Sequence, residues 1–236
     1  MSEITVIMPV YNGAEFREAS IDSVLNQTFK NFKFLILNDN STDKTADILD
    51  DYQKKDSRIQ VIHKTENKGP AHLRNEGIAL AKTEFIALID ADDIALPSRF
   101  EKQVSFLINN PDYGVCGTWF TFFGDKKNRT VKHQASHEGL KVQMLKNCCI
   151  GNPTVMLRKS HLGDLRFENE YVPAEDYRLW SQLIAVTKFH NIQESLLLYR
   201  WHPNNISQTK IENLKKVEVI IKEQQLQNLG ISLGPP

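Results

Sequence analysis

Short apolar runs alternate with helical stretches through the first 90 residues, and this alternation restricts the fold more than any other feature of the chain. The apolar runs lie at residues 4–8, 34–37, 59–62 and 85–89, and the helical stretches at 14–25, 43–52 and 70–81. Strands that alternate with helices of about 10–15 residues form βαβ units, in which the strands lie parallel. The sequence therefore predicts an α/β fold with a mostly parallel central sheet flanked by helices.

A polar cluster follows each of these apolar runs. The clusters are Tyr11-Asn12-Gly13 and the segments 38–43, 67–69 and 90–93. Parallel sheets bind ligands at the carboxyl ends of their strands. We therefore expect the four loops to converge on one crevice.

The last of these clusters is Asp90-Ala91-Asp92-Asp93, which directly follows a buried strand. Three carboxylates so close together repel one another and stay ionised most easily with a cation among them. Carboxylate oxygens suit Mg²⁺ or Mn²⁺, and Mg²⁺ at such sites usually also binds substrate phosphates. The cluster thus favours a diphosphate-bearing substrate, although an acidic turn that caps the helix near Pro97 is an alternative.

Asp39 lies at the tip of the second run, just before a segment rich in capping residues. Ser41, Thr42 or Asp43 is suited to cap the following helix, but capping leaves Asp39 unexplained. A carboxylate at the strand tip can accept hydrogen bonds from a nucleobase imide or a ribose hydroxyl.

The third helix follows Asn67-Lys68-Gly69, with Pro70 suited to its first position. Gly69 permits a close approach of the backbone to a ligand. Arg74 on the first turns is either a solvated charge or a partner for a carboxylate or phosphate at the crevice.

The second half of the chain is less regular. Its expected elements are a helix from about 97 to 109, a strand at 115–123, a mobile polar loop at 126–137, a helix at 175–186, a short strand at 196–200 and a terminal helix at 210–228. We see no repeat or linker, and so expect one domain over 1–207 and a helical tail over 208–236. Within the domain we expect the boundary between a donor-binding half and an acceptor-binding half at 112/113.

Composition excludes several classes of protein. Basic and acidic residues number 29 each, so no net field attracts nucleic acid or a membrane. We expect no signal peptide, because the N-terminus leads directly into the apolar run at 4–8, and no membrane-spanning helix, because no apolar stretch reaches about 18 residues. Cys116, Cys148 and Cys149 fit neither a disulfide framework nor a zinc site, which favours reduced thiols and a cytoplasmic location.

Eight short motifs, in order and over about residues 4–207, resemble those of the family 2 glycosyltransferases. The matching segments are 7–13, 23–28, 38–43, 67–69 with 74–75, 90–93 with 97–99, 153–156, 175–180 and 199–202. The resemblance implies a GT-A (Rossmann-like) fold with a C-terminal acceptor-side region, a nucleotide-sugar donor, a divalent metal and inversion at the anomeric carbon.

The resemblance also implies roles for single residues. The positions that would bind the donor are Pro9, Tyr11, Asp39, Asn67, Gly69, Arg74, Asp90, Ala91 and Asp92. Asp39 would read the base, and Asp90 would bind the ribose or lie beside the metal. Asp92 would ligate the Mn²⁺ or Mg²⁺ that bridges the diphosphate. His202 would complete the metal shell, as the resemblance suggests for the matching histidine of some relatives. Asp93 would hold a metal ligand in place without binding the metal itself, or would contact the sugar.

Inverting transfer also needs a general base to take the proton of the acceptor hydroxyl. Glu175-Asp176 begins a predicted helix, where two adjacent side chains point about 100° apart. We predict Asp176 as the base, by its family position, and Glu175 as a contact of the acceptor or donor sugar. The alternative is that both acids only complement the helix dipole.

Three further residues have open roles. Trp180 either packs in the core or walls the sugar site, and His202 is a metal or diphosphate ligand or an ordinary loop histidine. Many relatives have His-Pro-Ser or His-Pro-Thr where this chain has Asn152-Pro153-Thr154. Because asparagine does not titrate near neutrality, a proton or charge role is lost there, which affects the acceptor site more than the reaction.

These features predict a metal-dependent inverting hexosyl- or N-acetylhexosaminyltransferase that uses a nucleotide-sugar, most often a UDP-sugar in this family. The acceptor would be a cell-surface glycan such as lipopolysaccharide or capsule, or a lipid-linked oligosaccharide. One rival is a nucleotidyltransferase, but residues 9–13 lack the Gly-rich basic loop of that class. The other rival is a non-catalytic subunit that binds a nucleotide-sugar.

A lipid-linked acceptor allows peripheral contact with the inner face of the membrane, and no nucleic acid is expected. The terminal helix has an apolar face formed by Ile211, Leu214, Val217, Ile220 and Ile221. This face would pack on the domain, form a homodimer or dock on a membrane.

Overall fold

The computed structural model describes residues 4–125, 128–203 and 205–231. Its strands are β1 (Ile4–Val10), β2 (Phe32–Asn38), β3 (Ile59–His63), β4 (Phe85–Leu88), β5 (Ile94–Ala95), β6 (Tyr113–Gly124), β7 (Arg129–Val131), β8 (Met156–Arg158) and β9 (Lys188–Trp201). Its α-helices are α1 (Arg17–Leu25), α2 (Thr45–Lys55), α3 (Pro70–Leu80), α4 (Arg99–Asn109), α5 (His137–Met144), α6 (Lys159–Leu162), α7 (Glu175–Leu183), α8 (Ile206–Thr209) and α9 (Ile211–Asn228). Short 3₁₀ turns, η1 (Asn152–Thr154) and η2 (Asn169–Tyr171), precede β8 and α7.

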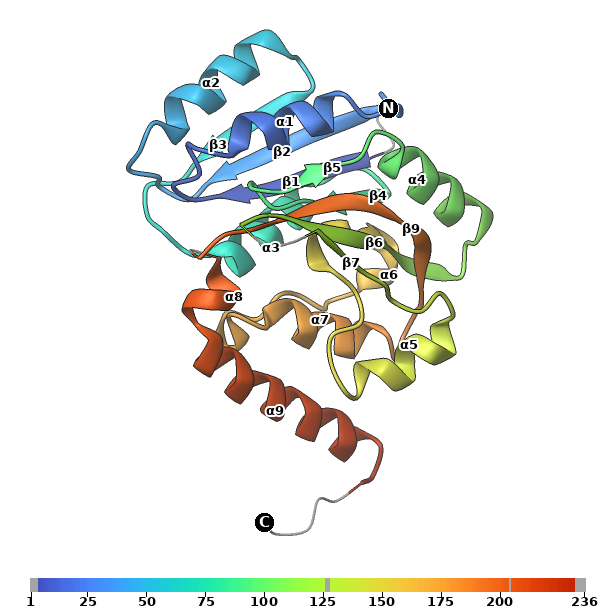
Figure 1. The fold of residues 1–236 in the computed structure, drawn as a ribbon. Coiled ribbons are helices and arrows are strands. Elements are labelled where there is room, and N and C mark those ends of the chain that lie inside the picture. Colours follow the sequence, from blue (N-terminus) through green and yellow to red (C-terminus); the bar gives the residue numbers. More distant parts are fainter. Residues whose placement is uncertain (1–3, 126–127, 204, 232–236) are drawn as a thin grey trace.

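One sheet runs through both halves of the chain in the order β3-β2-β1-β4-β8-β6-β9-β5 (Figure 1). β3, β2, β1 and β4 are parallel, as are β6 and β9. β8 lies antiparallel between β4 and β6, and thereby joins the two parallel groups. The predicted α/β fold with a mostly parallel sheet is confirmed.

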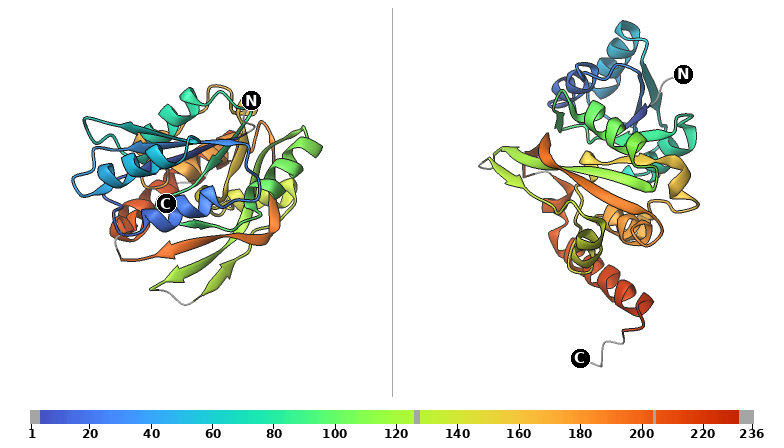
Figure 2. Two further views of the ribbon diagram at one scale, coloured as in Figure 1. Left: turned by 90° about the horizontal axis from the view of Figure 1, so that it is seen from above. Right: turned by 90° about the vertical axis from the view of Figure 1, so that its right-hand side faces the viewer.

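Two hydrophobic clusters cover the two faces of this sheet. Successive side chains of a strand point to opposite faces, and β1 accordingly sends Ile7 to one cluster and Val6 to the other. Helices α1, α2 and α4 cover one face, while α3, α5, α6 and α7 cover the other (Figures 1 and 2). Burial on both faces explains why the N-terminal strands are continuous apolar runs.

Two segments of the second half differ from their prediction. The expected loop at 126–137 contains β7, which pairs with Phe120–Phe122 of β6, although residues 126–127 lie outside the described part of the chain. The expected short strand at 196–200 is the end of the longer β9, which pairs with β6 through irregular register shifts. Polar residues such as Gln193 and Glu194 interrupt the apolar pattern of β9 and conceal its first half in the sequence.

The terminal helix α9 packs on the domain through part of its apolar face. Val217 and Ile221 are buried in the same cluster as α7, and Leu214 packs against it. Ile211 and Ile220 remain exposed. None of the helices in the described part of the chain is long and apolar enough to cross a membrane.

Candidate active site

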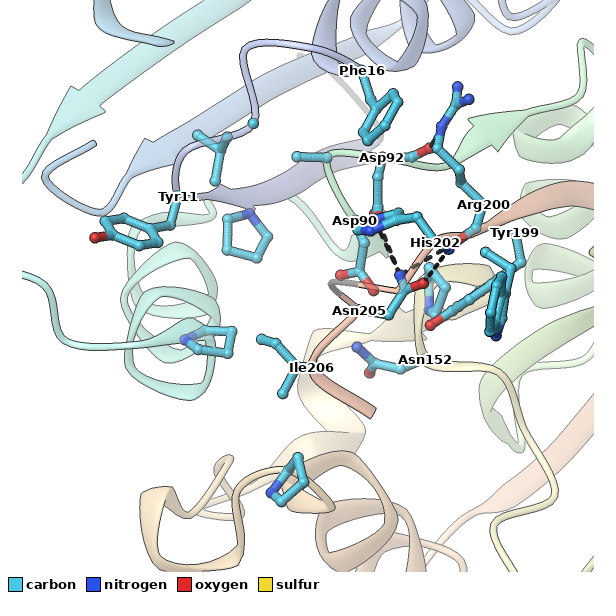
Figure 3. A pocket seen from close by; sticks show the side chains of 18 of the residues that line it. Tyr11, Phe16, Asp90, Asp92, Asn152, Tyr199, Arg200, His202, Asn205 and Ile206 are labelled. Atoms are coloured by element: carbon cyan, nitrogen blue, oxygen red, sulfur yellow. Dashed lines mark hydrogen bonds and ion pairs between the residues drawn. The ribbon is translucent and has the colours of Figure 1, made fainter. Parts of the chain in front are cut away.

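A cleft of about 940 Å³ opens where the strands β1, β2 and β4 end (Figure 3). Loops after β1, β2 and β4 line it, together with the start of α3, as expected from the four polar clusters. The start of α7, the ends of β6 and β9 and the turn η1 complete its wall. Of the predicted site residues, Pro9, Tyr11, Asp39, Arg74, Asp90, Ala91, Asp92, Glu175, Asp176 and His202 line the cleft.

Asn67 and Gly69 do not line the cleft but hold Asp39, which does. The backbone N–H groups of Lys68 and Gly69 donate to the two oxygens of the buried Asp39 carboxylate, at 2.9 and 2.8 Å. Asn67 Nδ2 donates to the Asp39 carbonyl oxygen at 3.4 Å, and Gly69 has a φ of 83°, which favours glycine. A carboxylate has about four lone-pair positions, so Asp39 can still accept from a ligand.

The loop after β1 is tied to the segment after β2 by several hydrogen bonds. Asn12 Oδ1 accepts from the backbone N–H of Thr42 at 2.8 Å, and its own backbone N–H donates to Ser41 Oγ at 2.9 Å. Asp43 accepts from the N–H of Ala14 at 3.0 Å and of Thr45, at the start of α2, at 2.9 Å. The N-cap of α2 is Lys44 and makes no side-chain capping bond, so none of Ser41, Thr42 and Asp43 is the predicted cap. These residues instead fix the loop that carries Tyr11, which is exposed at the mouth of the cleft.

Arg74 is buried, so its reading as a solvated helix charge is wrong. Its guanidinium donates to Asp90 Oδ1 at 2.8 Å and to Glu175 Oε1 at 2.9 Å. Burial disfavours the charge, yet Asp90 and Glu175 keep the pKa of Arg74 above its ordinary value. Arg74 thereby connects the loop after β4 with the first turn of α7.

Asp92 and His202 lie side by side, although 110 positions separate them in the sequence (Figure 3). His202 Nε2 is 3.0 Å from Asp92 Oδ2, and Asn205 Nδ2 donates to the same oxygen at 3.2 Å. Within the described residues, no group of three His, Cys, Asp or Glu side chains could enclose a metal ion. Mg²⁺ and similar ions often take one or two carboxylates and complete their shell with water and substrate phosphates, and Asp92 with His202 fits that mode.

Asp93 points away from the cleft and is fully buried. It accepts from the backbone N–H of Arg200 at 2.9 Å, and burial, with the charges of Asp92 and Asp90, raises its pKa well above the ordinary range. The expectation that Asp93 contacts a sugar is therefore wrong. Its structural effect is to hold β9 against the acidic loop.

Glu175 and Asp176 are neighbours in sequence but differ in environment. Glu175 is buried against Arg74, whereas Asp176 is only partly buried, lines the cleft and accepts from the N–H of Tyr177 at 2.7 Å. Burial and the nearby charge of Glu175 raise the pKa of Asp176 to about 7. A carboxylate with this pKa can accept a proton near neutral pH.

Trp180 is fully buried between Phe167 and Phe189 and does not line the cleft. Its reading as a wall of the sugar site is wrong, and its reading as a core residue is right. It anchors α7, whose first turn carries Asp176, in the core.

Arg200 and Asn205 are functional candidates that the sequence did not single out. The guanidinium of Arg200 lies 4.4 Å from each of the ring centroids of Phe16 and Phe123, and its Nε donates to the Asp92 carbonyl oxygen at 2.9 Å. Arg200 lies within a recognised motif, but its contact with Asp92 depends on the pairing of β9 with β5, which directly follows the acidic loop. Asn205 lies just beyond the motif, and no sequence pattern connects it with Asp92.

The structural comparison identifies a shared fold. TarS of S. aureus in complex with UDP-GlcNAc matches with a TM-score of 0.80 at 20% identity, over 99% of this chain and 68% of that one. The mannosyltransferase PcManGT of Pyrobaculum calidifontis, in complex with GDP-Man and Mn²⁺, matches with a TM-score of 0.72 at 17% identity, over 99% and 66%. These likenesses bear out the expected GT-A fold.

The sequence comparisons identify the family as well as the fold. An uncharacterized glycosyltransferase of Methanocaldococcus jannaschii is 35% identical over 84% of this chain and 70% of its own length. WfgD of Escherichia coli, described as a UDP-Glc:α-D-GlcNAc-diphosphoundecaprenol β-1,3-glucosyltransferase, is 32% identical over 90% and 83%. The sequence profile described as Glycosyl transferase family 2 matches residues 5–166. The chain therefore belongs to glycosyl transferase family 2 and is a glycosyltransferase.

Proposed function

We propose that this protein transfers a sugar from a UDP-sugar to a hydroxyl group of a lipid-linked glycan acceptor, with a divalent metal and with inversion. The observation that carries the proposal is one cleft that is lined by the adjacent pair Asp92 and His202 and also by Asp176, whose pKa is raised to about 7. Two relatives in Escherichia coli, WfgD and WfaP, are described as using UDP-Glc and α-D-GlcNAc-diphosphoundecaprenol. The related TarS has been seen with UDP-GlcNAc.

On the donor side, the loops after β1 and β2 would hold the nucleoside. Tyr11 would stack on the base with Pro9 beneath it, and Asp39 would accept from the imide N–H of uracil. Asp90 and Ala91 would lie at the ribose, where Arg74 fixes the direction of the Asp90 carboxylate. Asp92 and His202 would hold Mn²⁺ or Mg²⁺, which when bound offsets the charge that develops on the leaving diphosphate.

On the acceptor side, Asp176 would act as the general base. The acceptor oxygen forms a bond to the anomeric carbon while the bond from that carbon to the diphosphate oxygen breaks, and the acceptor proton passes to the Asp176 carboxylate. Glu175 accepts a hydrogen bond from Arg74, which positions the first turn of α7. The negative charge of Glu175 also raises the pKa of Asp176. Asp176 is thus the acid of the pair that stays available for proton transfer.

The same division suggests how the chain is organised. We assign donor binding to residues 1–112 and acceptor binding to 113–207. Residues 208–236 form a tail whose helix α9 packs against α7 of the acceptor half. An acceptor on a lipid carrier requires that the cleft meet the inner face of the membrane in the cytoplasm. A homodimer through the exposed part of α9 is a further arrangement consistent with Ile211 and Ile220.

Calorimetric titration with UDP, GDP, CDP and ADP, each with and without Mn²⁺, tests the donor assignment. We expect Mn²⁺-dependent binding of UDP that is lost in Asp92→Ala and kept in Asp51→Ala, an exposed acid outside the cleft. Binding of a different nucleotide would overturn the UDP assignment, and no metal-dependent binding would overturn the proposed reaction. Transfer from UDP-Glc or UDP-GlcNAc that disappears in Asp176→Asn, with UDP binding retained, separates an enzyme from the alternative of a non-catalytic binding subunit.

A further inference from the structure

We propose that Phe120, Phe122, Tyr199 and Asn152 form a subsite for the sugar ring of the acceptor. In this subsite the ring stacks on aromatic side chains and the Asn152 amide binds one of its polar substituents. This inference rests on the proposed function, because it places the acceptor beside the base of that reaction.

The three aromatic residues form one wall of the cleft. Phe120 and Phe122 alternate along β6, so both point to the same face of the sheet, and Phe122 is paired with Tyr199 of β9 in the register. Their ring centroids are 5.4 Å apart for Phe120 and Phe122, 5.6 Å for Phe120 and Tyr199, and 5.3 Å for Phe122 and Tyr199. All three are only partly buried, which leaves aromatic surface facing the cleft.

Asn152 lies directly beside this wall. The preceding Gly151 packs so closely on Phe120 that a Cβ there would lie 2.9 Å from Phe120 Cε1. Figure 3 shows the Asn152 side chain next to Tyr199. The Phe120 ring therefore fixes the backbone that presents the Asn152 amide to the cleft.

The Asn152 amide has hydrogen-bonding capacity that the protein does not use. The residue is 6% exposed, and its Oδ1 has no hydrogen-bond partner among the described residues. A buried polar group without a partner is destabilising, so a ligand that supplies the partner is favoured. Since a side-chain amide both donates and accepts, it can bind a hydroxyl or an acetamido group.

The chemistry of this wall fits a neutral sugar ring better than a nucleotide diphosphate. A pyranose has an apolar C–H face, which suits an aromatic wall, and a polar edge, which suits an amide. A diphosphate instead needs cationic partners, which a divalent metal held by Asp92 and His202 would supply. Asp176 lines the same cleft, so a ring on the aromatic wall can present a hydroxyl to the base.

Saturation-transfer NMR titrations of the full chain with UDP and Mg²⁺ test the subsite. The probes are methyl N-acetyl-α-D-glucosaminide and methyl α-D-glucopyranoside, and the variants are Phe122→Leu and Asn152→Ala. We expect Phe122→Leu to weaken binding of the glycosides about five- to tenfold and to leave the Kd of UDP unchanged. Weakening by Asn152→Ala of the acetamido probe alone identifies the acetamido group as its partner, and equal weakening of both identifies a hydroxyl.

The matched control is Phe106→Leu, which removes a partly buried ring that stacks on His190 outside the cleft. Glycoside binding that is equally weakened in Phe106→Leu and Phe122→Leu would overturn the subsite, as would UDP binding without any glycoside binding to the wild type. If both subsite variants bind the glycosides as wild type does, the inference is also overturned. Failure of UDP binding in the wild type is a separate result that counts against the proposed reaction.

Discussion

The two sides of the cleft differ in how far the protein satisfies its own polar groups. On the side that we assign to the donor, Asp39 is held by two backbone amides, Asn12 ties two loops together and Arg74 holds Asp90. On the side that we assign to the acceptor, aromatic rings line the cleft, the Asn152 oxygen has no partner among the described residues, and the pKa of Asp176 is raised. A preorganised side binds one ligand of fixed shape well. On the other side, polar groups such as the Asn152 oxygen gain hydrogen-bond partners only when a ligand binds. Such a site suits an acceptor that differs between family members.

The largest effect should come from Asp176→Asn. Loss of a general base typically reduces the rate roughly 10²–10⁴-fold, and the isosteric amide keeps the local packing. We expect this loss in sugar transfer, with the Kd of UDP within twofold of wild type, measured by a coupled assay for released UDP and by calorimetry. Equal losses in transfer and in UDP affinity would mean that the two sides of the cleft are not separable.

Arg74 is the group that joins the two sides, so Arg74→Met should strongly destabilise the fold. Removing one partner of a buried ionic network leaves Asp90 and Glu175 uncompensated and costs about 3–5 kcal/mol. Denaturant unfolding measures this loss, and Arg74→Lys should recover part of it. The control Lys188→Met removes only an exposed pair with Asp112 and should change stability far less. Equal stabilities of the two Met variants would show that Arg74 does not join the sides.

Asp176 should also make the stability of the protein depend on pH. Its pKa is about 7 in the folded state against an ordinary 3.8, so the folded protein binds the proton more tightly than the unfolded chain. Stability from this group is greatest below the unfolded pKa and falls as the pH rises through this window. The free energy of unfolding of Asp176→Asn, minus that of wild type, should therefore increase from pH 4 to pH 7. Unfolding curves of both proteins at about four pH values in this range measure the difference. A difference between the two proteins that does not change over this range would show that the pKa of Asp176 is not raised.

The smallest effect expected is that of Asn12→Gly on the donor side. Asn12 has a φ of 46°, which glycine tolerates, so the change removes only the side-chain bonds to Thr42. A hydrogen bond is worth about 1 kcal/mol, so UDP should bind about fivefold more weakly while the KM of the acceptor stays unchanged. The control is Asn40→Gly, since Asn40 has a φ of 58° and its side chain makes no hydrogen bond among the described residues. Equal losses of UDP affinity in the two variants would show that the side-chain hydrogen bonds of Asn12 do not contribute to UDP binding.

The sequence predicted well which residues line the side of the cleft that we assign to the donor, because the information for that side is local. Each of the first strands is a buried apolar run that ends in its own polar cluster, so strand, loop and candidate ligand lie within a few residues of one another. Asp39, Asp90 and Asp92 could therefore be placed at one sheet edge before the structure was known. The bond of Asp39 to Gly69 follows from the same adjacent loops.

The acceptor side was predicted less well because it depends on contacts between distant segments. The strands at 115–123 and 196–200 were both predicted, but no local pattern indicates that they pair with each other and bring Tyr199 beside Phe122. The position of Arg200 between Phe16 and Phe123 likewise follows from tertiary packing alone. Asp176 was found only through the family motif, because acids at a helix start are common for capping reasons.

The most direct test of the account is the pH dependence of kcat/KM for sugar transfer between pH 5 and pH 9, since this ratio reports the pKa values of the enzyme before substrate binds. Because Asp176 must be ionised to accept the acceptor proton, the rate should rise tenfold per pH unit at acidic pH and level off above an apparent pKa near 7. The residual rate of Asp176→Asn should lack this acidic limb. A wild-type rate that does not change with pH over this range, or an acidic limb that persists in Asp176→Asn, would contradict the assignment of Asp176 as the base.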